Sequence, residues 1–141
     1  MMTAAYQAFI SLSLKKRPHL TPVLDTLGNV LQQQHIKPFI FVDRYHFSSG
    51  QEKEMMRQAR LDIDASDMLI AEASHKAIGV GIEVGYAAGR NIPIIYLRNT
   101  EAEYSTTLGG MASFEIAYTN TASLAEQLAP ILSSILLKGK T

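Results

Sequence analysis

Residues 66–90, SDMLIAEASHKAIGVGIEVGYAAGR, decide the fold of this 141-residue chain. The apolar run from Asp67 to Ala73 is typical of a strand that is buried on both faces. A turn-rich break covers Ser74 to Gly79, and Gly81 to Gly89 then has the composition of a helix that a glycine closes. A buried strand that leads through a loop into a helix is the repeating unit of a parallel sheet.

One carboxylate, Glu83, stands at the start of that predicted helix. A helix N-terminus stabilises a carboxylate, so a capping role explains the residue in the simplest way. The alternative is a catalytic nucleophile beside a glycine loop whose free backbone N–H groups accept an anion. In that case we expect Glu83 in the first helical turn, where the macrodipole favours the ionised form.

The rest of the chain continues the same alternation of strand and helix. We expect strands at residues 4–11, 38–42, 67–73, 92–97 and 114–118, and helices at 21–35, 49–65, 81–89, 106–112 and 123–137. These elements predict one α/β domain over residues 1–141, in which helices cover both faces of a five-stranded parallel sheet. If the strand order is 2-1-3-4-5, that of a flavodoxin-like three-layer sandwich, a ligand crevice opens at the carboxyl ends of strands one and three.

Composition excludes several classes of function. The 13 basic and 13 acidic residues cancel, which argues against a nucleic-acid polymer as partner and against electrostatic membrane attachment. The chain has no cysteine, so it has no disulfide, thiolate nucleophile or zinc–thiolate site. No His, Asp or Glu spacing suggests a metal site, and no leader or membrane-spanning run is visible. We therefore expect a cytoplasmic protein without metal or cofactor.

Residues 66–97, the opening stretch extended by NIPIIYL, resemble the central signature of the nucleoside 2-deoxyribosyltransferase-like superfamily. Within it the likeness is nearest to the 2'-deoxynucleoside 5'-phosphate N-hydrolases. The resemblance implies an N-glycosidase that acts on a nucleoside or nucleoside 5'-monophosphate, by hydrolysis or deoxyribosyl transfer. It also implies a homodimer or higher homo-oligomer, and it matches Glu83 to the nucleophile at the anomeric carbon.

The same resemblance assigns further roles. Tyr6, on the first strand, matches the tyrosine that positions the nucleophile and the sugar. Gly79 and Gly81 match the phosphate-side loop. Thr107, or nearby Ser105, falls where the family places a hydroxyl on phosphate across the dimer interface.

The chain also departs from the family pattern. Ala77 stands where a loop serine contacts phosphate, and Ala59 stands where an aspartate of the preceding helix is expected. Asp62 lies one turn later and is the leading candidate for the acid that protonates the departing base. His75 and Lys76 are candidates for the lost phosphate contacts.

Three residues near the ends of the first two strands complete the predicted site. Ser11 is assigned to substrate binding, and His46 to the base pocket. His46 and Asp43 are further candidates for the acid, although both also fit a plain surface loop.

Two other functions stay open. Residues 6–13, YQAFISLS, resemble the opening strand of Toll/interleukin-receptor-type domains, some of which cleave NAD through a glutamate. Ala59 and Ala77 instead suggest a nucleotide-binding or sensing module that has lost catalysis. The sequence leaves the base, the sugar and the need for phosphate undetermined.

Overall fold

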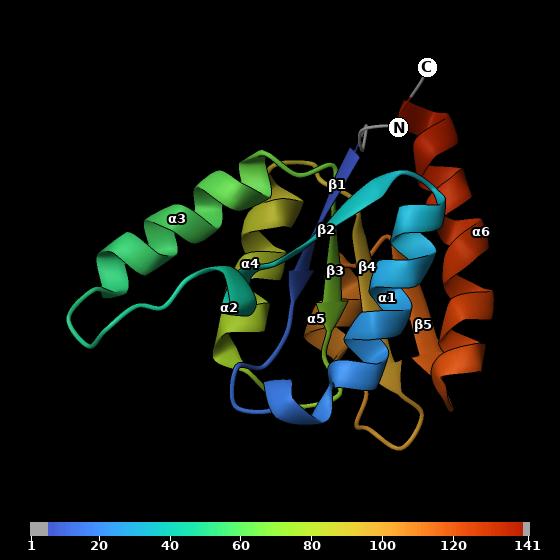
Figure 1. The fold of residues 1–141 in the computed structure, drawn as a ribbon, viewed down its shortest axis with the longest axis horizontal. Helices are drawn as coiled ribbons and strands as arrows, with labels where there is room; N and C mark the ends of the chain where they lie inside the picture. The colour runs from blue at the N-terminus through green and yellow to red at the C-terminus, as the bar shows by residue number, and fades with distance from the viewer. Residues whose placement is uncertain (1–5, 140–141) are drawn as a thin grey trace.

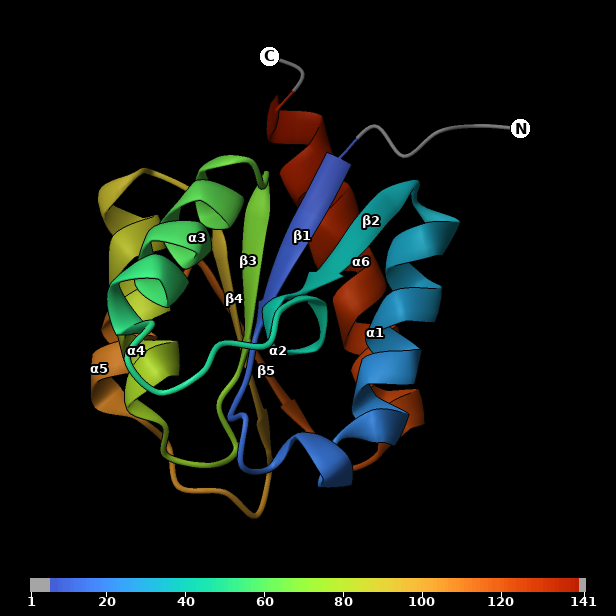
Figure 2. The same cartoon turned by 60° about the vertical axis from the view of Figure 1, so that its left-hand side comes forward.

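The computed structural model describes residues 6–139 and shows a five-stranded sheet between two layers of helices (Figures 1 and 2). All strand pairs are parallel, and the order is β2-β1-β3-β4-β5. This confirms the predicted fold class and strand order. The strands are β1 (Tyr6–Ser11), β2 (Ile36–Ile40), β3 (Met68–Glu72), β4 (Ile94–Asn99) and β5 (Phe114–Tyr118).

The helices divide between the two faces of the sheet, as Figure 2 shows. One face carries α1 (Thr21–Gln33) and α6 (Thr121–Gly139), which contact each other. The other carries α3 (Glu52–Asp64), α4 (Ile78–Gly89) and α5 (Thr106–Met111). The short elements η1 (Arg17–His19) and α2 (Phe41–Arg44) follow β1 and β2, so both lie at the carboxyl edge of the sheet.

The central strand β3 shows how the sequence separates the two faces. Its five residues are all buried, as the apolar run predicts. Met68 and Ile70 pack in the core under α1 and α6, whereas Leu69 and Ala71 pack in the core under α3 and α4. This division follows from the alternation of side chains along a strand.

Several element boundaries differ from the prediction by one to three residues, residues 4–5 of the first predicted strand lie outside the described part of the chain, and two of the differences bear on the site. The second strand was expected to run to Val42, but β2 ends at Ile40, opposite Ile10, and residues 41–44 form α2. Phe41 is buried there, with its ring 5.8 Å from that of Phe9. Aromatic packing therefore overrides the β propensity of this segment.

The helix α4 begins at Ile78, three residues before its predicted start. Neither Gly79 nor Gly81 has a positive φ, so both continue a regular helical turn and do not form a loop. Among residues 6–139, none of the helices combines the length and the apolarity that crossing a bilayer requires.

Candidate active site

The last residue of β1 and the second turn of α4 meet at the carboxyl edge of the sheet. Ser11 lies on the same face as Phe9, two residues before it, and this face is the one that α4 covers. The Ser11 hydroxyl donates a hydrogen bond of 2.5 Å to Glu83 Oε1, and Ser11 is only 1% exposed. The carboxylate is thereby held in one orientation by a side chain that is itself buried.

Burial sets the protonation state of Glu83. It raises the pKa of the carboxyl to about 7, while the hydrogen bond from Ser11 acts in the opposite direction. The expected placement in the first helical turn is wrong, because α4 starts at Ile78 and Glu83 is its sixth residue. The macrodipole acts mainly within the first turn, so it does not keep this group ionised. Near neutral pH the carboxyl is present in both forms.

A groove of about 760 Å³ lies between the start of α4 and the loop that leads into α5, and neither Ser11 nor Glu83 is among the residues that line it. The first-turn N–H groups of α4 lack intrahelical partners, and the side chain of Ala77 gives the helix no cap. An added Cβ on Gly81 would meet nothing within 4 Å, so this glycine keeps the wall of the groove open. The start of α4 is therefore able to accept an anion.

The structure gathers one group of predicted residues around this groove. His75, Lys76, Ala77, Gly81 and Thr107 all line it. Thr107 does so in its own chain, whereas the sequence resemblance assigned it to the pocket of a partner.

The charged side chains that line the groove, Lys76 and Glu103, attract each other only weakly. Lys76 lies 3.7 Å from Glu103, and both side chains are largely exposed, at 93% and 78%. An ion pair of this kind contributes little, so Lys76 is free to turn toward an anion. His75 is exposed beside it.

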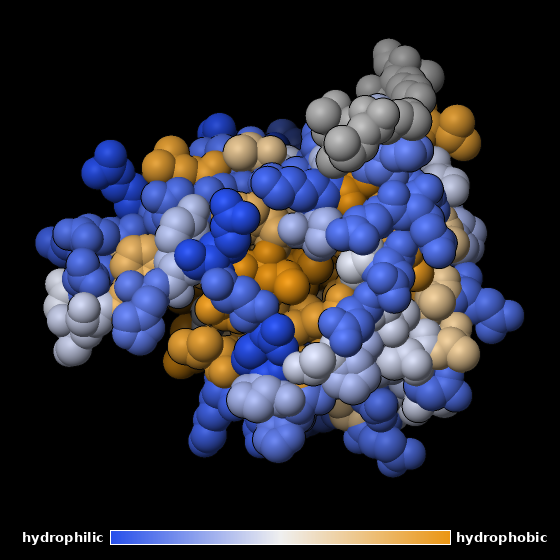
Figure 3. Space-filling view, in the orientation of Figure 1, coloured by the Kyte–Doolittle hydropathy of each residue, from blue (hydrophilic) through white to orange (hydrophobic). Residues whose placement is uncertain are grey.

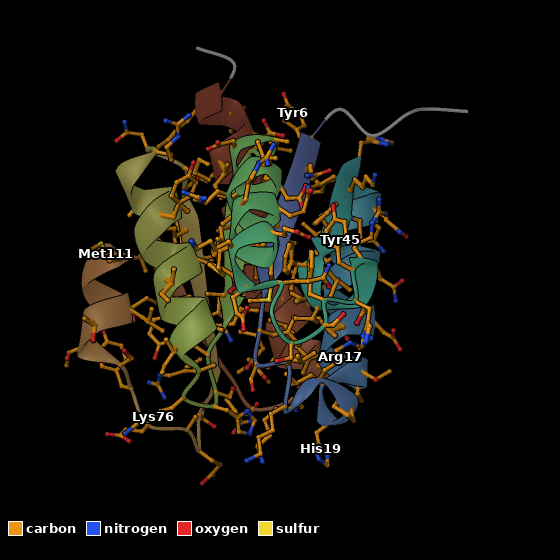
Figure 4. All side chains as sticks on the ribbon, turned by 90° about the vertical axis from the view of Figure 1, so that its left-hand side faces the viewer. Tyr6, Arg17, His19, Tyr45, Lys76 and Met111 are labelled. Atoms are coloured by element: carbon orange, nitrogen blue, oxygen red, sulfur yellow. The ribbon has the colours of Figure 1, made fainter. Side chains whose placement is uncertain are left out.

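The structure does not bring Tyr6 to Glu83. Tyr6 begins β1 and Ser11 ends it, and five residues of strand span roughly 17 Å. Figure 4 shows Tyr6 at the end of the sheet opposite Lys76. There Tyr6 lines a second groove with Asp67, of about 700 Å³, at the amino ends of the strands. Ser11 therefore replaces Tyr6 as the residue that orients the carboxylate.

The candidates for the acid lie outside this hydrogen-bonded pair. Ala59 is fully buried on the side of α3 that faces α4. Asp62 Oδ1 accepts a hydrogen bond of 3.1 Å from Gln58, and its Oδ2 is buried without a hydrogen-bond partner in the described part of the chain. Burial, and then the neighbouring Asp62, raise the pKa of Tyr45. Asp62 thus faces α2 and the segment after it.

The other two candidates have different surroundings. Asp43 forms a bidentate ion pair with Arg17, at 2.8 and 2.9 Å, which joins α2 to η1. His46 is exposed beyond α2. Asp43 is occupied by a structural contact, and neither residue contacts Glu83.

An aromatic cluster near α2 was not predicted as a unit. Phe41 lies 5.2 Å from Tyr45 and 6.2 Å from Phe47, measured between ring centroids. Figure 3 shows apolar side chains in a hollow between α3 and α1, in the middle of this face. The spacing of the aromatic residues 39, 41, 45 and 47 was the available signal, but a strand interpretation of residues 38–42 concealed it.

Comparisons with known proteins agree with this fold. A family model for nucleoside 2-deoxyribosyltransferase matches residues 16–127, which include Glu83. A Syntrophotalea carbinolica protein named as a 2'-deoxynucleoside 5'-phosphate N-hydrolase is 39% identical over 74 residues, or 52% of this chain. The chain spans about half, 51%, of the length of that relative.

Two solved structures share the fold. The CMP N-glycosidase of Clostridium botulinum has a TM-score of 0.62 at 20% identity, over 86% of this chain and 97% of that one. The 2-deoxyribosyltransferase from Bacillus psychrosaccharolyticus has a TM-score of 0.63 at 11% identity, over 84% and 90%. Because the family model matches most of the chain, this protein belongs to the nucleoside 2-deoxyribosyltransferase family.

Proposed function

We propose that this protein is an N-glycosidase that cleaves a nucleoside or nucleoside 5'-monophosphate, with Glu83 as the nucleophile. The observation that carries the proposal is the half-buried Glu83 carboxylate, which Ser11 fixes at 2.5 Å on the same helix whose start lines the groove. Membership of the family and the names of the relatives support the same reaction class.

The proposed reaction runs in two steps. The ionised Glu83 attacks C1' of the sugar while the C1'–N bond breaks, and the bonding electron pair leaves with the base. Water then attacks C1' of the glycosyl ester in hydrolysis, or a nitrogen of a second base does so in transfer, and Glu83 is released as carboxylate. The proton that the attacking group loses returns to the acid that protonated the departing base. Because the pKa of Glu83 is about 7, the ionised fraction rises through neutral pH.

The departing base must gain a proton, and we assign the donor to Asp62. Its support is the buried Oδ2 without a partner on the side of α3 that faces α2. The aromatic residues around Phe41 offer flat apolar surfaces on which a base can stack. Asp62→Asn is expected to lower kcat while the KM changes little, since the proton is transferred in the transition state.

The groove at the start of α4 is proposed to hold a 5'-phosphate. The uncapped N–H groups of α4, together with Lys76 and His75, would supply the positive field. Lys76→Ala should therefore raise the KM for a 5'-monophosphate and leave the KM for the unphosphorylated nucleoside unchanged.

We also propose a cytoplasmic homodimer or higher homo-oligomer that associates through α4. Most residues of this helix are apolar or glycine, and its Ile78 and Ile82 are 84% and 52% exposed. Apolar helix surface of this kind is normally covered.

One observation favours a second candidate, a nucleotide-binding module without turnover. The position where the family places an aspartate is Ala59, which is fully buried and has no polar group to offer. Such a module would bind nucleotide in the α4 groove and release no base.

The test is base release from ribo- and deoxyribonucleosides, their 5'-monophosphates and NAD. Wild-type protein is compared with Glu83→Gln and with Glu126→Gln, an exposed glutamate of α6 on the other side of the sheet. Release that Glu83→Gln abolishes and Glu126→Gln retains supports the nucleophile, whereas unchanged turnover in Glu83→Gln overturns it. Ligand-induced thermal stabilisation without release would instead favour the binding module.

A further inference from the structure

A buried carboxylate, Glu72, ends β3 on the face of the sheet opposite Glu83. It follows Met68 and Ile70 in alternation, so it points toward the layer of α1 and α6. Its exposure is 1%, and a charge at such depth is tolerated only with several hydrogen-bond donors. The apolar appearance of residues 67–73 gave no sign of this role.

Glu72 has those donors. Its Oε1 accepts from the backbone N–H of Ser74 at 2.9 Å. Its Oε2 accepts from the Ser74 hydroxyl at 3.0 Å and from the Tyr118 hydroxyl at 2.5 Å. Burial and the neighbouring Glu72 raise the pKa of Tyr118 well above its ordinary value, which keeps the hydroxyl protonated as a donor.

These contacts join the carboxyl ends of three strands. Glu72 ends β3, Tyr118 ends β5, and the backbone N–H of Asn99, at the end of β4, donates to the Ser74 hydroxyl at 2.8 Å. The position of Ser74 is therefore fixed from three sides, through its N–H and through both functions of its hydroxyl.

Ser74 is the point from which the chain enters the candidate site. Only residues 75–77 separate it from α4. Among the described residues, few contacts hold this segment in place. Ala77 caps no N–H group, and the ion pair of Lys76 with Glu103 is exposed. The hydrogen bonds of Glu72 are thus the main buried restraint on the loop that starts α4.

We propose that Glu72 is a positioning residue that holds the β3–α4 loop, through Ser74, in the geometry that accepts the anionic group of the substrate. It touches no substrate itself, because it lies behind the sheet. The inference deepens the proposed function, on which its kinetic test rests, while amide exchange tests the positioning independently.

The main variant is Tyr118→Phe, which removes the 2.5 Å donor with almost no change of volume and lies outside the groove. Glu72→Gln is the second variant, and it exchanges one acceptor oxygen for a donor. Tyr6→Phe is the matched control, since Tyr6 lies at the opposite edge of the sheet. Each protein is assayed with one base as nucleoside and as 5'-monophosphate.

We expect both variants to raise the KM for the 5'-monophosphate roughly tenfold, the loss of one charged hydrogen bond. The KM for the nucleoside and the kcat should stay within about twofold, and Tyr6→Phe should match wild type. Hydrogen exchange of the amides of residues 74–81 should accelerate in both variants. An equal rise in KM for the nucleoside and the 5'-monophosphate would overturn the positioning role. Unchanged amide exchange of residues 74–81 would also overturn it.

The two proposals fail in different ways. If wild-type protein releases no base, the proposed function fails, but faster exchange of residues 74–81 in Tyr118→Phe still supports the restraint. If wild-type protein is active and the amides of residues 74–81 exchange at the wild-type rate in Tyr118→Phe and in Glu72→Gln, only the role of Glu72 is refuted. If Glu72→Gln does not fold, Tyr118→Phe alone decides.

Discussion

Ser11 and Glu83, which are 72 residues apart in the chain, are joined by a hydrogen bond of 2.5 Å between hydroxyl and carboxylate. This contact connects the end of β1 with the second turn of α4. It opposes the larger effect of burial, so the Ser11 hydroxyl limits how far the pKa of the proposed nucleophile is raised.

Ser11→Ala should move the pH profile toward alkaline values. Ser11 lowers the pKa of Glu83, so its removal lets burial raise that pKa above about 7. The ionised form is then scarcer at low pH, and we expect turnover at pH 6 to fall roughly tenfold, with recovery toward pH 9. Rates between pH 5 and 9 check this. Ser13→Ala is the matched control because Ser13 is also buried but hydrogen-bonds the N–H of Lys16.

Glu83→Gln should abolish activity and stabilise the fold at alkaline pH. Glu83 has a folded pKa of about 7 against 4.5 in the unfolded chain, so the folded state holds the proton longer. Stability from this group is full below pH 4.5 and is lost as pH rises through 7, by at most about 3 kcal/mol. Glutamine does not ionise, so the variant keeps its stability as the pH rises through 7. Urea unfolding at pH 5 and pH 8 should show the variant ahead only at pH 8, and a wild-type stability independent of pH would contradict this.

Gly109→Ala should destabilise the protein by about 1–3 kcal/mol. The Tyr104 hydroxyl packs so closely on Gly109 that an added Cβ forces the ring away, and the ring then loses its stacking on Tyr96. Gly110→Ala is the control because a Cβ there meets nothing within 4 Å. It should be neutral or slightly stabilising within the helix. Urea midpoints compare the two, and equal midpoints would show that Tyr104 moves without cost.

Ile82→Lys should weaken self-association if α4 forms the interface. Ile82 is 52% exposed on α4, and Leu61 on α3 is 51% exposed, so Leu61→Lys is an evenly matched control. Sedimentation at several concentrations measures the result. Dissociation in the α4 variant alone is expected. A wild-type monomer at every concentration, or equal dissociation of both variants, would count against this interface.

The sequence was sufficient for the architecture because its signals are local. An alternation of buried strands and helical connections, joined by right-handed crossovers, leaves few topologies, and 2-1-3-4-5 is one of the common ones. Glu83 was singled out as the candidate nucleophile for a similar reason: the residues around it form one continuous stretch that resembles the family signature.

The site itself needed the register of the sheet. Tyr6 and Ser11 belong to the same short strand, and only the position along it separates the two edges of the sheet. A likeness of residue types does not fix that position. The acid is equally difficult to assign from the sequence, because the surroundings of Asp62 depend on how the segment of residues 41–47 folds near α3.

The protonation states and the Glu72 contacts were beyond the reach of sequence patterns. The pKa of Glu83 depends on which segments bury it, and Glu72 meets Tyr118 across 46 residues of chain. Hydrogen bonds of this separation have no periodic signature. Their donors are ordinary residues until the fold brings them together.

The alternation of β3 has a consequence for laboratory evolution. Leu69 and Ala71 belong to the layer that holds Glu83, while Met68, Ile70 and Glu72 belong to the other, and the two cores pack separately. A library that randomises Leu69 and Ala71 should therefore change the substrate range. Its effects should combine additively with those of stabilising substitutions in α1 and α6. A library that instead randomises Met68, Ile70 and Glu72 would change the core under α1 and α6 together with the loop contacts of Glu72. Few of its clones would fold.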